Sequence, residues 1–272
     1  MSDPDPPIVI DPTIPSTARM YDYMLGGKDN FPADREAAEQ IIELGRQAGF
    51  DLRDITRANR AFLVRVVRTL AESGVRQFLD IGTGLPTQQN VHQVAQSVAP
   101  DARTVYVDND PIVLTHARAL LADSPQTIAM AGDLREPAKI LADPAIRAHL
   151  DFDQPFAIIA FAILDLIVDD DLAAHIMATL RGELPSGGYL AISHGYARIL
   201  GVNKMDEAHE LFQSRRVGDF AHRPPAMVAT YFKDLELLEP GVVPVELWRP
   251  TYDQWPGDPD NSGFIGAVGR KP

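Results

Sequence analysis

Cysteine is absent from the 272-residue sequence, and its absence excludes a whole branch of chemistry. The chain cannot form a disulfide, use a thiolate nucleophile or hold a metal through sulfur. None of the seven histidines pairs with another at the H-x-x-x-H spacing of a helical zinc site. We therefore predict no metal.

Long apolar runs and clusters of basic residues are also missing. The longest apolar run, 156–164, is far shorter than the roughly 20 residues of a membrane-spanning helix. Acidic residues outnumber basic ones by 38 to 25, and nucleic acids or anionic membranes require clustered Lys and Arg. We expect neither as a partner. Without the basic start and apolar core of a signal peptide, the chain is predicted to be cytoplasmic.

Three regions follow one another along the chain. Residues 1–15, rich in Pro and Asp, are predicted to form a flexible tail. Residues 16–74 are expected to form a helical extension. Ser16 caps its first helix, the second begins after Asp34, and the third spans about 54–73. Residues 75–272 are predicted to form one α/β domain.

In this third region, short apolar segments alternate with helices. Strands are expected at 77–81, 104–107, 127–131, 156–161 and 189–193. Helices are expected at 87–98, 111–122, 136–150 (broken), 170–184, 203–216 and 224–235. Segments 242–247 and 264–268 are expected to close the sheet as an antiparallel hairpin. The alternation predicts right-handed crossovers and a mostly parallel sheet with helices on both faces.

The most informative segment is FLDIGTGLP, in which a buried strand ends in Gly82 and Gly84. Glycine permits unusual backbone dihedrals there and lets a ligand approach closely. In an open parallel sheet, ligands bind beyond the carboxyl ends of the strands. The segment therefore predicts a ligand site at this turn.

Three features of the turn make a dinucleotide such as NAD the weaker alternative. Thr87 stands where G-x-G-x-x-G has its third glycine, and Pro86 removes an amide that could bind phosphate. Asp80 would repel a diphosphate, since two unit charges about 4 Å apart interact by roughly 4 kcal/mol at an effective dielectric near 20. The same carboxylate would attract a cationic ligand.

Two more aspartates follow the next two predicted strands. Asp108 can accept hydrogen bonds from both ribose hydroxyls, and Asp133 can accept one from an adenine amino group. A single aspartate in such a place is as easily a cap of the next helix. Three on successive strands together indicate a positively charged nucleoside without phosphate.

The segments FLDIGTG, VYVDND and AGDL resemble the successive binding motifs of class I S-adenosylmethionine-dependent methyltransferases. Over nearly its whole length the chain resembles the actinobacterial S-adenosyl methyltransferase family, whose substrates are largely unassigned. The N-terminal segment PSTARMYDYMLGGKDNFPADREAAE is the most specific part, because general methyltransferases lack it. The resemblance implies a Rossmann-like, seven-stranded sheet with one antiparallel strand, and S-adenosylmethionine as methyl donor.

The resemblance also implies how the cofactor is held. Its methionine part is expected at Asp80, Gly82 and Gly84, its ribose at Asp108 and Asn109, and its adenine at Asp133 and Leu134. Thr83 and Gly132, which lie in the same turns, complete the expected contacts.

The segment from Tyr21 to Phe31 suits a lid over a bound cation, because two glycines are flanked by aromatic and charged residues. The ring of Tyr23 could attract the sulfonium, and Lys28 or Arg60 could pair with the methionine carboxylate. The alternative is a helix that is simply docked by its aromatic residues.

Methyl transfer requires the donor and the nucleophile to be aligned and, for a hydroxyl or ammonium acceptor, a proton to be removed. The candidate bases are His194 and Asp165, which follow the fifth and fourth predicted strands. A hydrogen-bonded structural histidine and a capping aspartate are the alternatives. Similar proteins often read Leu-His where this chain has Leu164-Asp165, so the role of that histidine is absent here or has moved.

We predict methyl transfer to the oxygen or nitrogen of a small molecule. Two other functions stay open: a catalytically silent S-adenosylmethionine-binding regulatory protein and, with less support, an NAD-dependent oxidoreductase. The sequence leaves monomer and homodimer equally open.

Overall fold

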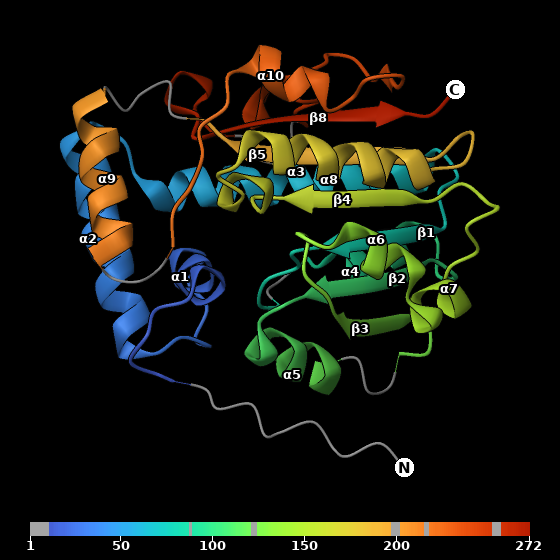
Figure 1. The fold of residues 1–272 in the computed structure, drawn as a ribbon, viewed down its shortest axis with the longest axis horizontal. Coiled ribbons are helices and arrows are strands. Elements are labelled where there is room, and N and C mark those ends of the chain that lie inside the picture. Colours follow the sequence, from blue (N-terminus) through green and yellow to red (C-terminus); the bar gives the residue numbers. More distant parts are fainter. Residues whose placement is uncertain (1–10, 87–88, 121–123, 197–201, 215–217, 252–256) are drawn as a thin grey trace.

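Five apolar segments form the parallel centre of one sheet, as predicted (Figure 1). They are β1 (Gln77–Ile81), β2 (Arg103–Asp108), β3 (Thr127–Ala131), β4 (Ala157–Phe161) and β5 (Tyr189–Gly195). The computed structural model describes residues 11–86, 89–120, 124–196, 202–214, 218–251 and 257–272. Residues 1–10 of the predicted tail and Thr87 lie outside the described residues.

The far end of the sheet contains its one reversed strand. β8 (Phe264–Arg270) runs antiparallel to β5, and the two-residue strands β6 (Glu236–Leu237) and β7 (Val243–Pro244) both pair with β8. The order is β3-β2-β1-β4-β5-β8-β6, with β7 beside β8. The predicted fold class is confirmed. The described strands number eight instead of seven, because β6 and β7 occupy successive stretches of the same edge.

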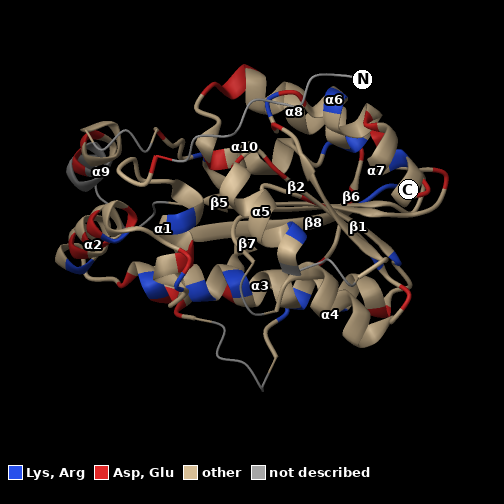
Figure 2. Cartoon of the chain, turned by 90° about the horizontal axis from the view of Figure 1, so that it is seen from below, with Lys and Arg blue, Asp and Glu red and all other residues tan. Residues whose placement is uncertain are grey.

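Helices cover both faces of the sheet (Figures 1 and 2). Those along the chain are α1 (Thr17–Met24), α2 (Pro32–Gln47), α3 (Leu52–Glu72), α4 (Val91–Val98), α5 (Pro111–Leu120), α6 (Pro137–Ala142), α7 (Pro144–His149), α8 (Asp170–Glu183), α9 (Val202–Ser214) and α10 (Pro225–Thr230). The short 3-10 turns are η1 (Leu164–Leu166), η2 (Val245–Leu247) and η3 (Pro259–Asn261). α3, α4 and α5 contribute to the core on one face, and α6, α7, α8 and α10 to the core on the other.

Strand β4 shows why both faces must be covered. All five of its side chains are buried, and because strand side chains alternate, they divide between two cores. Ala157, Ile159 and Phe161 face α3, whereas Ile158 faces α8. A continuous apolar strand of this kind is typical of a sheet buried on both faces.

Two predicted elements differ from those observed, and one predicted interruption is confirmed. The break expected within 136–150 falls at Asp143, whose carboxylate caps α7 by accepting from the backbone N–H groups of Ala145 and Ile146. The strand expected at 242–247 is extended only at Val243–Pro244 before the chain turns into η2. The helix expected at 224–235 ends at Thr230.

The N-terminal helices gather at the carboxyl ends of the parallel strands. α1 and α2 share a small apolar core, and α9 packs on the same core through Leu211 and Phe212 (Figure 1). α3 instead contributes its inner face, including Phe62 and Val66, to the core of the sheet. α1 and α2 thus lie above the strand ends, whereas α3 packs on one face of the sheet.

Candidate active site

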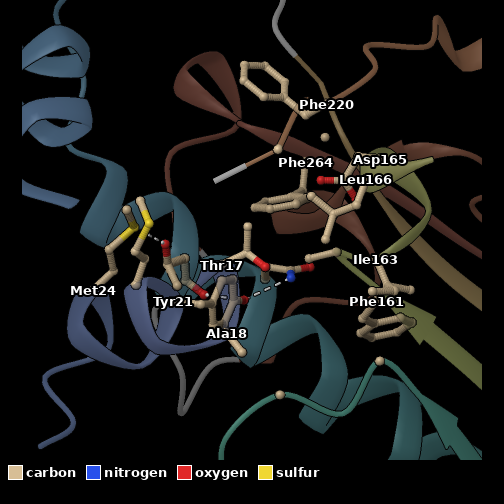
Figure 3. A pocket seen from close by; sticks show the side chains of 18 of the residues that line it. Thr17, Ala18, Tyr21, Met24, Phe161, Ile163, Asp165, Leu166, Phe220 and Phe264 are labelled. Atoms are coloured by element: carbon tan, nitrogen blue, oxygen red, sulfur yellow. Dashed lines mark hydrogen bonds between the residues drawn. The ribbon is translucent and has the colours of Figure 1, made fainter. Parts of the chain in front are cut away.

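A cavity of about 590 Å³ lies where the ends of β1 to β5 meet α1, α2 and α3. Its volume is within the range of about 300–1,000 Å³ of small-molecule sites. Part of its wall is polar and comes from the strand ends. The other part is apolar and includes aromatic rings, which Figure 3 shows around Phe161, Phe264 and Tyr21. The cavity therefore has two chemically different halves.

The glycine turn after β1 forms the floor of the polar half. Gly82 and Gly84 have φ values of +74° and +66°, a region that favours glycine. A Cβ on Gly82 would also lie 2.5 Å from Cγ1 of Ile163, so the turn can approach this residue only without a side chain. The Thr83 hydroxyl donates to the backbone carbonyl of Asp80 at 3.1 Å. Asp80, Gly82, Thr83 and Gly84 all line the cavity.

Asp108, at the end of β2, holds this turn in place. Its Oδ2 accepts from the backbone N–H of Gly84 at 2.9 Å, and its Oδ1 accepts from that of Asp110 at 2.8 Å. Burial raises the pKa of Asp108, and these backbone donors oppose the rise. The carboxylate is thus fixed at the cavity wall before any ligand is bound.

Asp80 and Arg60 both line the cavity wall and lie close enough to interact electrostatically. Burial, opposed by Arg60 and assisted by the nearby Asp108, raises the pKa of Asp80 to about 7. The buried Nε of Arg60 has no hydrogen-bond partner. Arg60 is therefore close enough to influence Asp80 but retains donors for a ligand.

The remaining strand-end residues line the cavity at the tip of β3. Gly132, Asp133 and Leu134 are there, together with Asn109 after β2. The Asp133 carboxylate is already paired, with Nε of Arg135 2.9 and 3.0 Å from its two oxygens. That pairing is the main reason why the pKa of Asp133 is lowered. A ligand amino group would have to share this carboxylate with Arg135.

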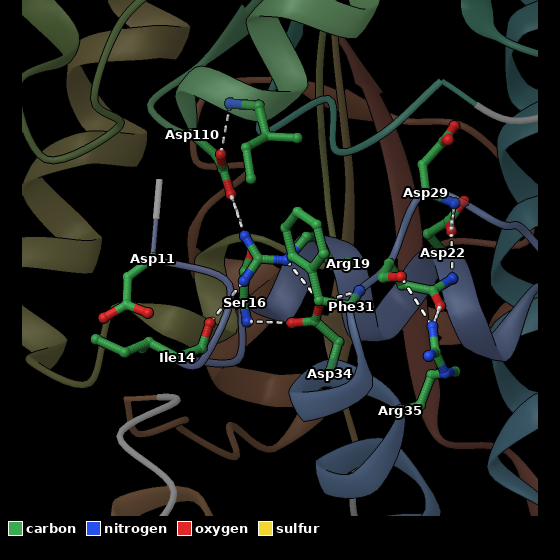
Figure 4. Close-up of polar contacts among 12 residues, drawn as sticks. Asp11, Ile14, Ser16, Arg19, Asp22, Asp29, Phe31, Asp34, Arg35 and Asp110 are labelled. Atoms are coloured by element: carbon green, nitrogen blue, oxygen red, sulfur yellow. Dashed lines mark hydrogen bonds and ion pairs between the residues drawn. The ribbon is translucent and has the colours of Figure 1, made fainter. Parts of the chain in front are cut away.

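A buried polar cluster attaches α1 to the loop after β2 (Figure 4). Nε of Arg19 lies 2.7 Å from Oδ2 of Asp34, and both side chains are almost completely buried. Oδ1 of Asp34 accepts from the backbone N–H of Ser16 at 2.9 Å. The sequence predicted that Ser16 caps α1, but its hydroxyl makes no capping hydrogen bond. It donates instead to Asp110 at 3.0 Å. We call Ser16, Arg19, Asp34 and Asp110 the N-terminal clamp.

The structure brings a different tyrosine to the cavity from the one that the sequence suggested. Tyr21 lines the cavity, and its hydroxyl accepts from Nδ2 of Asn59 at 3.0 Å. Tyr23 lies outside the cavity lining and contacts Glu39 at 2.5 Å. Lys28 is exposed and also outside the lining. Residues 21 and 23 point to different sides because they lie about 200° apart around a helix of 3.6 residues per turn.

Of the two candidate bases, His194 is fully buried in β5 and does not line the cavity. Its Nδ1 lies 2.9 Å from the carbonyl oxygen of Gly195, and its Nε2 lies 3.0 Å from Nη1 of Arg223. Because a guanidinium can only donate, Nε2 must accept and Nδ1 must carry the proton. His194 is thus a neutral ring with both nitrogens engaged.

Asp165 lies on η1 and does line the cavity. Its Oδ1 is shielded from solvent and has no hydrogen-bond partner. Burial raises its pKa, and the positive charge of nearby Arg223 opposes this rise. The carboxylate is therefore free to accept from a ligand in the cavity.

The sequence analysis missed His222, which lines the cavity. Neither ring nitrogen has a hydrogen-bond partner, although the Gly195 backbone is near enough to favour the charged ring. Burial lowers the pKa of His222 to about 4, so the ring is neutral at neutral pH. The ring of Phe220 lies edge-on to it at 5.1 Å. His222 belongs to an irregular segment, where neither periodicity nor a strand end marks it.

No group of three His, Asp or Glu side chains in the described ranges could hold a metal ion. Nor does any helix among the described residues have the length and hydrophobicity to cross a membrane.

Comparisons with known proteins identify the family to which the chain belongs. The model of the S-adenosyl methyltransferase family matches residues 4–272. A candidate methyltransferase from Thermobifida fusca YX is 41% identical, with 95% of this chain and 96% of that chain covered and a TM-score of 0.86. A DUF574 family protein from Streptomyces avermitilis MA-4680 is 42% identical, with 97% and 100% covered and a TM-score of 0.89. No curated protein matches the chain. The chain belongs to the S-adenosyl methyltransferase family and is an S-adenosylmethionine-dependent methyltransferase.

Proposed function

We propose that S-adenosylmethionine binds in the polar half of the cavity and that a small molecule is methylated on oxygen or nitrogen in the apolar half. When bound, the cofactor supplies a methyl group on a positively charged sulfur. The observation that carries the proposal is the charge of the wall. Among the described lining residues, aspartates greatly outnumber the two cations, Arg60 and Arg135. A cationic ligand is favoured there and a diphosphate is not.

The residues present fit the parts of this cofactor. Nε of Arg60 is buried and has no hydrogen-bond partner. The guanidinium can therefore donate to the methionine carboxylate, which an arginine can bind with two parallel hydrogen bonds. Asp80 would accept from the ammonium group, with Gly82, Thr83 and Gly84 lining the same part of the wall.

The adenosine part would bind along the ends of β2 and β3. Asp108 and Asn109 are assigned to the ribose, and Asp133 with Gly132 and Leu134 to the adenine. The apolar side of Leu134, which is 5% exposed, suits the face of a base.

The N-terminal helices would close the site from above. We propose the division 1–15, 16–74 and 75–272 into tail, helical extension and class I methyltransferase domain. Since α3 is part of the sheet core, we assign the movement of a lid to α1 and α2 alone. The N-terminal clamp would hold them over the loop that contains Asn109.

Binding can be tested by titration calorimetry with S-adenosylmethionine, S-adenosylhomocysteine and NAD. We expect the two adenosyl compounds to bind and NAD not to bind. Arg60→Met should weaken binding about 10- to 100-fold, since a hydrogen bond to a charged group contributes roughly 1.5–3 kcal/mol. Arg57→Met is the matched control, because it removes an exposed arginine three residues away on α3. Tight binding of NAD, or equal affinities of the two variants, would contradict the proposal.

A further inference from the structure

The apolar half of the cavity contains an imidazole, that of His222, whose nitrogens make no hydrogen bond of ordinary geometry with the described residues. Both nitrogens of His222 are buried without a hydrogen-bond partner. Buried polar groups are almost always paired, so an exception calls for an explanation. Because the ring lines the cavity, a ligand in the cavity is the partner that the structure leaves for it.

The backbone on both sides of His222 is anchored to the same turn. Before it, the Ala221 N–H donates to the carbonyl of Asp165 at 2.7 Å. After it, Arg223 donates to the carbonyls of Leu164 and Ile167 at 3.2 and 2.6 Å. These contacts hold the segment of His222 against η1, which also places Asp165 in the cavity wall. A ring held in this way is positioned before the ligand arrives.

The surroundings of the ring are aromatic. Phe220 stands edge-on to His222 and stacks on His209 at 4.3 Å between ring centroids. Phe161 and Phe264 line the same cavity (Figure 3). Aromatic rings favour other aromatic rings in stacked or edge-to-face contact. A flat apolar ligand suits this half best.

The charges of the wall exclude an anionic acceptor. Arg135 is paired with Asp133, and the proposed function assigns Arg60 to the cofactor. No other Lys or Arg of the described chain lines the cavity. An acid group on the acceptor would therefore face aspartates without a cation to pair with.

We propose that the acceptor is an uncharged aromatic compound with a hydroxyl group, and that His222 accepts the proton of this hydroxyl. The inference rests on the proposed function. The hydroxyl oxygen forms the new bond to the methyl carbon, and the carbon–sulfur bond breaks with its electron pair left on sulfur. The proton moves from the hydroxyl to an imidazole nitrogen and then to solvent.

The protonation of His222 distinguishes a hydroxyl from an amine. A hydroxyl becomes strongly acidic as its oxygen is methylated, so even a weak base can take its proton. An amine that is protonated at neutral pH must lose its proton first, which a base with a pKa of about 4 does poorly. The hydroxyl is the nucleophile that this ring can serve.

Calorimetry on the full chain saturated with S-adenosylhomocysteine tests the proposal. The probes are 2-naphthol, its methyl ether and naphthalene-2-carboxylate. We expect 2-naphthol to bind about tenfold more tightly than the ether, as one buried hydrogen bond allows, and the carboxylate not to bind. His222→Phe should abolish the preference for 2-naphthol, whereas His222→Gln should retain part of it because an amide oxygen can still accept.

Three controls separate the possible causes. His175→Gln, an exposed histidine on α8, should leave every affinity unchanged. Asp165→Asn should leave the preference unchanged if His222 is the acceptor of the proton. Unaltered affinity for S-adenosylhomocysteine in the His222 variants would show that they are folded. A retained preference in His222→Phe, a preference lost only in Asp165→Asn, or no binding of 2-naphthol would overturn the inference. Failure of S-adenosylhomocysteine to bind the parent protein would instead overturn the proposed function.

Discussion

The carboxylate of Asp108 accepts a hydrogen bond from the backbone N–H of Gly84 at 2.9 Å. This contact joins the end of β2 to the turn after β1, two strands that lie side by side in the sheet. The residue assigned to the ribose therefore also shapes the turn assigned to the methionine part. Cofactor affinity should depend on Asp108 in two ways, directly and through the turn.

Asp108→Ala should weaken the binding of S-adenosylhomocysteine by about 100-fold. It removes an acceptor for hydroxyl groups and the hydrogen bond to Gly84, and bonds to a charged group contribute roughly 1.5–3 kcal/mol each. Asp101→Ala, an exposed aspartate just before the opposite end of β2, is the control. Calorimetry measures both. Similar affinities of the two variants would remove Asp108 from the site.

The affinity for S-adenosylmethionine should rise with pH because of Asp80. Its pKa of about 7 in the ligand-free protein means that the carboxyl is largely neutral below that value. A bound cation favours the ionised form, so binding releases a proton. Affinity should rise by about tenfold between pH 5.5 and 7 and level off above. Asp80→Asn should lack this dependence, and the difference between the two pH profiles isolates the contribution of Asp80.

The same residue should make the ligand-free protein less stable at higher pH. The folded-state pKa of about 7 lies above the ordinary value of 3.8. The folded state therefore holds the proton more tightly, and this contribution to stability is lost as pH rises from about 4 to about 7. Asp80→Asn should thus raise the free energy of unfolding at pH 8 and have little effect at pH 4. Urea denaturation at both pH values checks the sign, and an equal effect at the two would contradict it.

Arg223→Met should destabilise the fold. The Arg223 side chain is 1% exposed and donates to His194, to two backbone carbonyls and to Asp170. Leaving such buried acceptors unpaired costs about 3 kcal/mol, which at roughly 2–4 °C per kcal/mol lowers Tm by about 10 °C. The exposed Arg57→Met should change Tm by little. Differential scanning calorimetry measures the Tm of the two variants, and an unchanged Tm for Arg223→Met would refute the prediction.

Arg19→Met should loosen α1 and weaken cofactor binding without unfolding the sheet. The change leaves Asp34, which is 0% exposed, without its cation. We expect S-adenosylhomocysteine to dissociate about tenfold faster, measured by stopped-flow fluorescence. Arg46→Met, which removes an exposed arginine of α2, should leave the rate unchanged. Dissociation rates that agree between the two variants would mean that the N-terminal clamp does not control access to the site.

Residues near strand ends were the ones that could be placed from the sequence. Asp80, Asp108 and Asp133 lie at or just beyond the ends of apolar strands, whose strand character is local, and parallel strands bring their carboxyl ends to one edge. The exact orientation of α1 was not accessible in this way. Choosing Tyr21 over Tyr23 required knowledge of which side of a short helix faces the cavity, and the packing of α1 on α2 determines that side.

The local sequence pattern was sufficient to predict the alternation of strands and helices, the glycine turn and the acidic residues beside it. Each of these features depends on residues that are neighbours in the chain. Only the tertiary structure determined which side chains from other segments lie beside these residues. It paired Nε2 of His194 with Arg223, left His222 unpartnered and placed Arg60 beside Asp80. These side chains come from segments far apart in the chain, and the partner of a buried polar group is set by packing, which no periodicity records.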